Sequence, residues 1–434
     1  MEEKNVNFIP EREEKKSFGL KKLLVSLLLV AVIVTSFFLG YFVRYSSQSD
    51  ANKLYNEIIN IINYNVENAD EENADEIARA LIATLLSEDK YARYYTPAEY
   101  EDLKAQRDGV YEGIGVSFSQ DGSISKVIWN SPAENSGVQV GDKILAGKLL
   151  AEDYVTFDSV EQIAEFLSNC ENQSQITLKV ERNSVELELN VLKEEYSVNY
   201  VKYYDSEKTL TFSGKELEPT VIEGGKASLD GKTAFIKLTQ FEGEADVQIG
   251  KAMEYMKERG RTRLVLDLRD NGGGSIDTLK EIATYLICNN GKEYSRIAWI
   301  NDGKRINDVI IKKNRYNANI EKISILANQN TASASEILIG AMLADANSGG
   351  AFKMDNLVLT YNTERGNFST YGKGIMQTIY PLKNGGALKM TTAQLLWPDR
   401  VTCINGVGIA HSIEQNCFYD NNLAEERAIA IAKG

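Results

Sequence analysis

The sequence predicts an α/β protein held to a membrane by one N-terminal helix, and three observations carry this prediction. Residues 23–43 form an apolar run without a charge. From Gly109 onward, short apolar segments alternate with glycine turns, which is typical of a small β-rich domain. Further on, strand-like and helix-like segments alternate, as in a parallel sheet flanked by helices. The expected parts are a tail (1–22), a membrane helix (23–43), a helical region (44–108), a β-rich domain (109–192) and an α/β core (193–434).

Composition narrows the kind of partner that this chain can have. At 434 residues the chain is long enough for two or three domains. Its net charge of −14, without a dense basic patch, argues against a nucleic-acid partner. Four cysteines do not make a disulfide framework in a chain of this size. Cys403 and Cys417 could pair in an oxidising compartment, and the sequence does not decide whether they do.

The apolar run from Leu23 to Val43 is long enough to cross a bilayer. As a helix it would span about 32 Å at roughly 1.5 Å per residue. A cleaved signal peptide is the alternative, but its apolar region is usually shorter, and residues 40–44 make a poor cleavage site. Lysines at positions 15, 16, 21 and 22 precede the run, and only Arg44 closely follows it. We therefore expect a cell-membrane anchor with a cytoplasmic N-terminus and the rest of the chain outside.

Two segments after the anchor have the apolar spacing of helices, Lys53–Tyr64 and Asn73–Leu86. A third, short helix is expected after Pro97. These helices would form a stalk, a lid or an arm for a homodimer, and the sequence does not separate these possibilities.

The β-rich domain has a distinctive order of segments. The order is a glycine turn (113–116), a strand (125–129), a Ser-Pro-Ala turn (131–133), a second glycine segment (137–144), a helix (159–169) and two strands (175–181 and 185–192). This order resembles a PDZ domain in the circularly permuted bacterial form. The resemblance implies capture of a peptide C-terminus by strand addition, with the loop Gly113, Ile114, Gly115 and Val116 offering N–H groups to the carboxylate. The alternative is that these glycines only shape a hairpin.

The α/β core contains two strand–turn–helix units. Strands are expected at 234–238, 263–268 and 323–327, and helices at 245–259, 276–286 and 334–346. The second strand ends in the turn Gly272–Gly274, and the third ends in a turn through Ser333. Because α/β folds build their sites at the carboxyl ends of strands, we expect both turns to face a site.

Ser333 stands where either a helix cap or a nucleophile would stand. Ser333 and Glu336, three residues on, match a capping box before an apolar helix. A serine at a helix N-terminus also lies near the positive end of the helix dipole, which favours a developing oxyanion. The two roles are compatible.

Lys373 is the candidate general base. The chain has one histidine, His411, so a serine activated by a lysine is the simpler alternative to a histidine triad. A lysine must be neutral to accept a proton, and burial in an apolar pocket lowers its pKa. Gln377 lies four residues on and could orient the lysine, although a surface or strand-pairing role fits the spacing nearly as well.

Three motifs together have a family resemblance. The segments TASASEI (331–337), TYGKGIMQ (370–377) and DLRDNGGG (267–274), behind a PDZ-like domain, resemble the C-terminal processing peptidases, or tail-specific proteases. The resemblance implies a ClpP/crotonase-like ββα-spiral core that carries the PDZ domain as an insertion. It implies that Ser333 is the nucleophile, Lys373 the base and Gln377 the residue that positions it, with an oxyanion hole formed by the N–H groups of Gly273 and Ala334. Substrates would be proteins with apolar C-termini, which the PDZ domain senses while it gates an extracytoplasmic endopeptidase, and no metal or cofactor is implied.

The chain departs from the family pattern in three places. The interval from Ser333 to Lys373 is longer than usual, and the excess falls in residues 346–368, which are interpreted as an inserted hairpin or loop beside the site. Gly272 replaces a proline, which makes the glycine turn more mobile. Residues 408–412 replace the usual Pro-Asp ending, and His411 is expected to be a packing or surface residue.

Two other functions are kept open. A catalytically inactive PDZ adaptor would bind protein C-termini without cleaving them. A crotonase-like acyl-transfer enzyme would depend on a coenzyme A thioester. The sequence names neither the physiological substrate nor the oligomeric state, and it does not say whether the PDZ domain activates or inhibits.

Overall fold

The computed structural model describes residues 74–434, except 120–121, 129–130, 151, 213–218, 289, 347–348 and 411–413. The chain divides into two units, 1–78 and 79–434, and the account below concerns the second. The predicted membrane helix, the helix at 53–64 and His411 lie outside the described residues. Within the described part of the chain, no helix is both long and apolar enough to span a membrane. Helix α3 covers Ala74–Leu85 and helix α4 covers Pro97–Asp108, close to two of the predicted helices.

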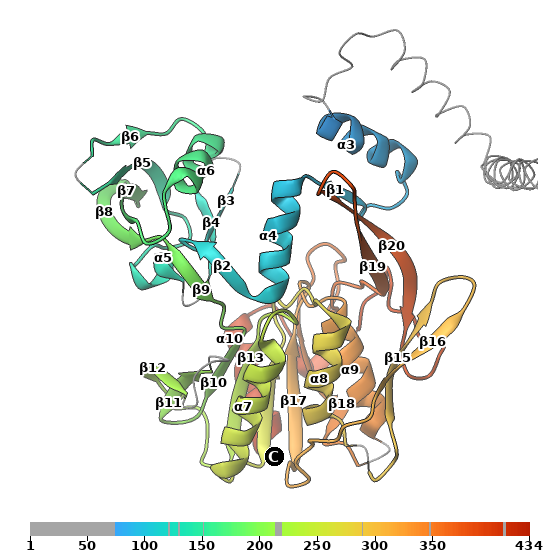
Figure 1. Cartoon of the computed structure of the whole chain (residues 1–434). Helices are drawn as coiled ribbons and strands as arrows, with labels where there is room; N and C mark the ends of the chain where they lie inside the picture. The colour runs from blue at the N-terminus through green and yellow to red at the C-terminus, as the bar shows by residue number, and fades with distance from the viewer. Residues whose placement is uncertain are drawn as a thin grey trace, which may run out of the picture. The chain divides into compact units, whose positions relative to one another are not determined.

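Residues 110–197 form a β-rich part with its own core (Figure 1). Its elements are β2 (Val110–Gly113), β3 (Val116–Phe118), β4 (Ile124–Val127), α5 (Pro132–Asn135), β5 (Lys143–Leu149), β6 (Val155–Thr156), α6 (Val160–Asn169), β7 (Gln175–Arg182), β8 (Val185–Leu192) and β9 (Glu194–Ser197). Strands pair in the order β6-β5-β7-β8, with separate pairs β3-β4 and β2-β9. In β7, Ile176, Leu178 and Val180 are fully buried and alternate with more exposed residues, so one face of the sheet covers the core. The predicted helix is confirmed, and the side chain of Ser159 caps it by accepting the N–H of Gln162.

The α/β part is built on an eight-stranded sheet in the order β12-β11-β10-β13-β14-β17-β18-β21. Its strands are β10 (Val201–Tyr204), β11 (Lys208–Thr211), β12 (Thr220–Gly224), β13 (Thr233–Leu238), β14 (Arg263–Asp267), β17 (Lys322–Ala327), β18 (Phe352–Thr360) and β21 (Cys417–Phe418). The five strands β13, β14, β17, β18 and β21 of this sheet run parallel to one another. Its helices are α7 (Ala245–Glu258), α8 (Ile276–Leu286), α9 (Ala334–Asp345) and α10 (Asn421–Lys433). The three strands and three helices predicted in this part are confirmed to within about one residue.

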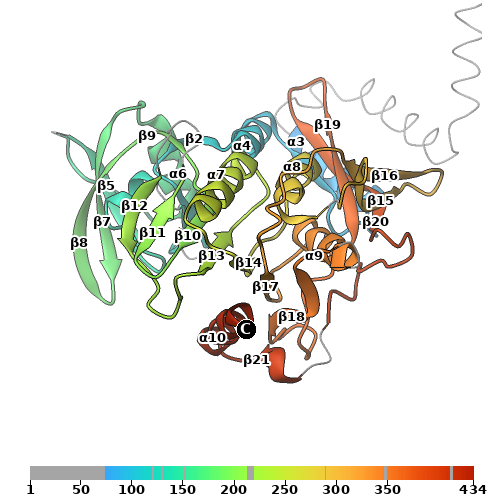
Figure 2. The same cartoon turned by 90° about the horizontal axis from the view of Figure 1, so that it is seen from below.

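Helices cover both faces of this sheet, and the strand sequences explain why. In β14, Leu264 and Leu266 join the core formed with α7, α8 and α9, whereas Val265 joins the core formed with α10. Figure 2 shows α10 on the opposite side of the sheet from those three helices. A strand buried on both faces is apolar throughout, as expected for the centre of a parallel sheet.

A smaller sheet lies beside the core and carries the lysine loop. It contains β1 (Arg93–Tyr95), β15 (Ser295–Asn301), β16 (Ile306–Ile311), β19 (Ile375–Pro381) and β20 (Ala387–Leu396). The long strand β20 pairs antiparallel with β1, β15 and β19. Strands β1 and β19 therefore both flank β20, although almost 300 positions separate them in the sequence.

The interpretation of residues 346–368 as an inserted hairpin or loop is wrong. Strand β18 occupies Phe352–Thr360 and pairs in parallel with β17, inside the main sheet. Leu357, Val358 and Leu359 are fully buried, an apolar run of the kind expected for a central parallel strand. Only the turn after β18 lies beside the lysine loop, where the Arg365 guanidinium donates to the carbonyl of Tyr371 at 2.5 Å.

Candidate active site

Ser333 lies on a sharp turn between β17 and α9. Its backbone has φ +55° and ψ −115°, a region that a residue with a side chain rarely adopts. Such strain persists only where the surroundings impose it, and a serine on a strained strand-to-helix turn is the arrangement of a nucleophile elbow. The neighbouring glycine turn leaves little space, since a Cβ added to Gly273 would lie 2.7 Å from the Cβ of Ser333.

The capping box contributes more than a helix cap. Oε2 of Glu336 accepts the N–H of Ser333 at 2.9 Å, which is one half of the predicted capping box. Glu336 is fully buried and also binds the lysine loop. It accepts the N–H of Gly372 at 2.8 Å, the N–H of Lys373 at 2.9 Å and the hydroxyl of Thr370 at 2.5 Å. One carboxylate therefore joins the serine turn to the lysine loop.

Burial, above all, raises the pKa of Glu336, and the four hydrogen bonds that it accepts oppose this shift. The link from Glu336 to the lysine loop is not predicted from the sequence. The available signal is that α9 is largely apolar and almost wholly buried, so an acid in its first turn must be buried and needs partners.

Lys373 has the surroundings that a neutral lysine needs. Its Nζ donates to Oε1 of Gln377 at 2.9 Å, and Nε2 of Gln377 donates to the carbonyl of Tyr91 at 3.1 Å. Burial, above all, and the nearby ammonium of Lys389 lower the pKa of Lys373, while the carboxylate of Asp89 opposes the shift. The lowered pKa increases the fraction of neutral amine near neutral pH.

Ser333, Lys373 and Gln377 line one cavity of about 600 Å³, and Gly272, Gly273 and Gly274 line it too. Beside it is a small recess that borders Ser333. Apart from Ser333, it is lined by Gly274, Ile276, Leu279, Ala298, Val309, Ala334, Ile337 and Leu395, which are glycine or apolar residues. The structure thus brings the three predicted catalytic residues together at one cavity, with apolar residues behind Ser333.

The predicted oxyanion donors differ in their availability. The N–H of Gly273 donates to Oδ1 of Asn271 at 2.9 Å, so it must exchange this bond before it can serve an oxyanion. Asn271 is fully buried, and its Nδ2 donates to the carbonyl of Leu238 at 3.0 Å. The N–H of Ala334 belongs to the first turn of α9, where N–H groups have no partner within the helix.

The predicted peptide-binding loop precedes β3. Gly115 has φ +87°, and a Cβ there would lie 2.2 Å from the Cβ of Ser131, so this position requires glycine. Ile114 is buried, and its carbonyl accepts the N–H of Ala133. Val116 begins the pair β3-β4, in agreement with the hairpin interpretation. The loop is therefore held rigidly, and peptide binding by Gly113–Val116 stays a prediction.

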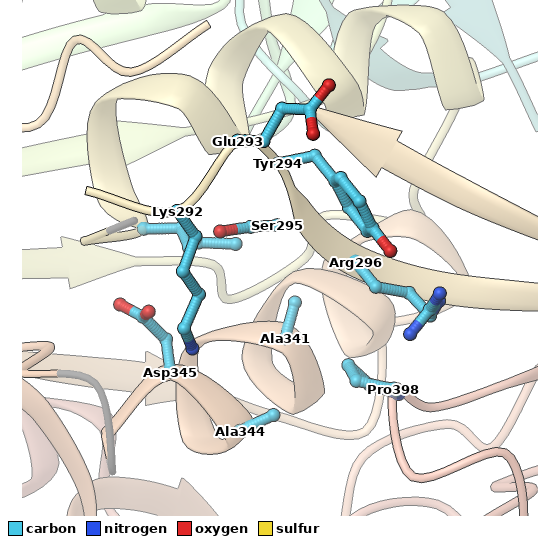
Figure 3. A pocket seen from close by; sticks show the side chains of 10 residues that line it. Lys292, Glu293, Tyr294, Ser295, Arg296, Ala341, Ala344, Asp345 and Pro398 are labelled. Carbon is cyan, nitrogen blue, oxygen red and sulfur yellow. The ribbon is translucent and has the colours of Figure 1, made fainter. Parts of the chain in front are cut away.

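A second cavity, of about 430 Å³, lies at the other end of α9 and contains none of the predicted site residues (Figure 3). Figure 3 shows Lys292 and Asp345 close together on one side of it. Burial raises the pKa of Asp345 to about 6. A hydrogen bond from the N–H of Cys288 at 2.6 Å and the charge of Lys292 oppose this shift.

All four cysteines, including Cys403 and Cys417, are free thiols in the structure.

Glu242 lines the large cavity and yields a prediction about stability. Burial raises the pKa of Glu242 to about 7, against the charge of Arg107. In the unfolded chain this carboxyl ionises near pH 4.5, whereas in the folded protein it keeps its proton up to about pH 7. Between these two pH values the folded state binds more protons than the unfolded state, so the free energy of unfolding falls as the pH rises. Glu242→Gln should therefore raise the melting temperature relative to wild type more at pH 8 than at pH 5. Equal differences at both pH values, as expected for an exposed control such as Glu258→Gln, would contradict the prediction.

Comparisons with known proteins fit this geometry. The family model for peptidase family S41 matches residues 232–347, which include Ser333, and the model for a PDZ domain matches residues 112–192. A probable CtpA-like serine protease of Staphylococcus aureus (strain MRSA252) is 26% identical over 88% of this chain and 68% of its own length. These matches support a serine-type peptidase, with an S41-like segment at residues 232–347.

One further relative and one solved structure are named as processing proteases. The chloroplastic carboxyl-terminal-processing peptidase 2 of Arabidopsis thaliana is 28% identical over 76% of the chain, and the chain spans 58% of that relative. A solved structure of the photosystem II D1 C-terminal processing protease is similar over 82% of this chain and 84% of its own chain. The identity is 21% and the TM-score is 0.46. Lys373 and Gln377 lie beyond the two segments that the family models match.

Proposed function

We propose that this chain is a membrane-anchored, extracytoplasmic serine endopeptidase that cleaves proteins near their C-termini. The observation that carries the proposal is that a strained Ser333 and a partly buried Lys373 of lowered pKa line the same cavity. Both turns are fixed to the same carboxylate, that of Glu336. Such mutual fixation is what a nucleophile and its base require.

The proposed reaction proceeds through an acyl-enzyme. As Oγ of Ser333 attacks the scissile carbonyl, its proton passes to the neutral amine of Lys373. The N–H groups of Ala334 and Gly273 stabilise the oxyanion, after Gly273 has released Asn271. The ammonium of Lys373 then protonates the leaving amine as the peptide bond breaks. A water that gives its proton to Lys373 attacks the ester, and the acid product leaves as Ser333 regains its proton.

The remaining parts of the proposal concern the surrounding domains. The PDZ domain, residues 109–192, would bind apolar C-termini through Gly113–Val116 and gate the peptidase core at 193–434. We infer a ClpP/crotonase-like ββα spiral for that core. The parallel strands β13, β14, β17 and β18, with the helices between them, support this inference. The anchor at 23–43 would hold the peptidase outside the cell membrane. Resistance of the C-terminal domain to protease added to intact cells would overturn this topology.

Peptide cleavage tests the enzymatic proposal directly. Full-length protein in detergent micelles is mixed with an unstructured reporter protein that ends in apolar residues, and products are followed by mass spectrometry. Wild type should cleave the reporter, and Ser333→Ala should not. A reporter with a charged C-terminus should be cleaved more slowly. Binding of the apolar tail without cleavage would favour the PDZ adaptor.

The oxyanion hole yields a prediction with a matched control. Gly273 has φ +97°, and a Cβ there would lie 2.8 Å from the nitrogen of Ala334. Gly273→Ala should therefore displace both oxyanion donors and lower kcat by about 10²–10³-fold. At Gly272 an added Cβ meets no atom within 4 Å, so Gly272→Ala should keep most of the activity. Equal activity of the two variants in the reporter assay would contradict the assignment.

A further inference from the structure

The base is completed by a part of the chain that lies far from it in the sequence. Residues 86–95, here called the covering segment, precede the PDZ domain and lie outside both segments matched by the family models. Two attachments fix this segment to the small sheet. The carboxylate of Asp89 accepts the N–H and the hydroxyl of Thr391, at 2.7 and 2.9 Å, and β1 pairs with β20.

Tyr91 lies between these two attachments and contacts the base in two ways. Its carbonyl accepts Nε2 of Gln377 at 3.1 Å, and Oε1 of Gln377 accepts Nζ of Lys373 at 2.9 Å. Its ring centroid lies 4.9 Å from the same Nζ. Burial, above all, raises the pKa of Tyr91, and a side-chain hydrogen bond with Tyr371 raises it further.

We propose that Tyr91 is a positioning residue for Lys373: its carbonyl fixes the glutamine that holds the lysine amine, and its ring shields that amine from water. This inference rests on the proposed role of Lys373 as the base. It adds that a serine and a lysine inside the core are not sufficient, because the covering segment supplies part of the surroundings that keep the amine neutral.

The direction of the expected effect follows from the groups around the amine. The charges that act on the amine are those of Lys389 on β20 and Asp89 on the covering segment. Around the Tyr91 ring lie Lys90, Tyr371, Arg365 and the Glu336 carboxylate, which also accepts the N–H of Lys373. Arg107, Glu242 and Asp277 line the same cavity as the amine. Contact with the face of the Tyr91 ring favours the ammonium form, whereas loss of water favours the neutral amine. Burial dominates the lowered pKa of Lys373, so removing the ring should raise that pKa.

The test measures the lysine itself and needs no substrate. Full-length protein is labelled with trace acetic anhydride between pH 6 and 11, and the acetylated fraction of the Lys373 peptide is read by mass spectrometry. In wild type the labelling midpoint should lie below that of an ordinary lysine, about 10.4. In Tyr91→Ala it should move up by about one pH unit. Tyr91→Phe and Tyr91→Leu, which keep an apolar cover, should stay near the wild-type midpoint.

A matched control separates shielding of the base from a general effect of losing a tyrosine. The ring of Tyr100 lies 4.8 Å from Nζ of Lys104, on helix α4. Tyr100→Ala should leave the Lys373 midpoint unchanged. An unchanged midpoint in folded Tyr91→Ala would overturn the proposal. If Tyr91→Ala does not fold, a Tyr91→Phe midpoint equal to wild type together with a Tyr91→Leu midpoint as high as an exposed lysine would overturn it too.

The labelling experiment and the cleavage assay can fail independently, so a failure of this inference is distinguishable from a failure of the proposed function. A low Lys373 midpoint that depends on Tyr91, in a protein that cleaves no reporter, would support the inference and contradict the peptidase proposal. Cleavage of the reporter by a protein whose Lys373 midpoint is the same with and without the Tyr91 ring would support the peptidase proposal and contradict the inference.

Discussion

Replacing Lys373 with methionine is expected to lower the rate of reporter cleavage by at least about a thousandfold, since general-base assistance alone is worth about 10²–10⁴ and nucleophile and base act as a unit. Methionine keeps an apolar stem of similar length, so the fold should persist. The wild-type rate should also rise with pH on an alkaline limb, because the lowered pKa of Lys373 makes the amine neutral as the pH increases.

Lys389 provides the matched control for this result. Its ammonium is the second cause of the lowered pKa of Lys373, after burial. Lys389→Met should therefore keep cleavage but move the alkaline limb to higher pH. A flat wild-type profile from pH 6 to 9, or a Lys373→Met variant as active as Lys389→Met, would argue against Lys373 as the base.

Glu336→Gln is expected to have the second largest effect, on both activity and stability. Oε1 of Glu336 accepts from Thr370 and Gly372, and Oε2 accepts from Ser333 and Lys373. A glutamine presents an NH₂ group to one of these donor pairs in either orientation, so buried donors are left without an acceptor. This should cost about 3 kcal/mol or more of the free energy of unfolding and separate the serine turn from the lysine loop.

Val358→Ala tests whether the loss of activity follows only from lower stability. Val358 on β18 is fully buried in the core on the α10 side of the sheet. Its truncation should lower the free energy of unfolding by about 2 kcal/mol, measured by urea unfolding, but leave cleavage of the reporter close to wild type. If Glu336→Gln retains wild-type cleavage under conditions where it is folded, the carboxylate does not join the two loops in the way described.

Local patterns in the sequence were enough to predict the elements that carry the site. The apolar strands β14 and β17, the turn through Ser333 and the helix after it follow from residues close together in the chain. Strand β18 was missed because the long interval before Lys373 was interpreted as an insertion, although Leu357–Leu359 has the apolar run of a buried strand.

Contacts between distant segments could not be predicted in this way. The bond from Gln377 to Tyr91 depends on how β1 and β19 both meet β20, which no local spacing encodes. A motif predicts which residue types act, whereas the pKa of the base depends on what packs around it.

The most direct test of the central claim is covalent labelling of the serine. Full-length wild type, Lys373→Met and Lys389→Met are treated with a fluorophosphonate between pH 6 and 9, and the modified residue is identified by mass spectrometry. The Ser333–Lys373 pair predicts one adduct, on Ser333, that forms faster as the pH rises and is lost in Lys373→Met. An adduct elsewhere, or labelling of Ser333 in Lys373→Met at the wild-type rate, would contradict it.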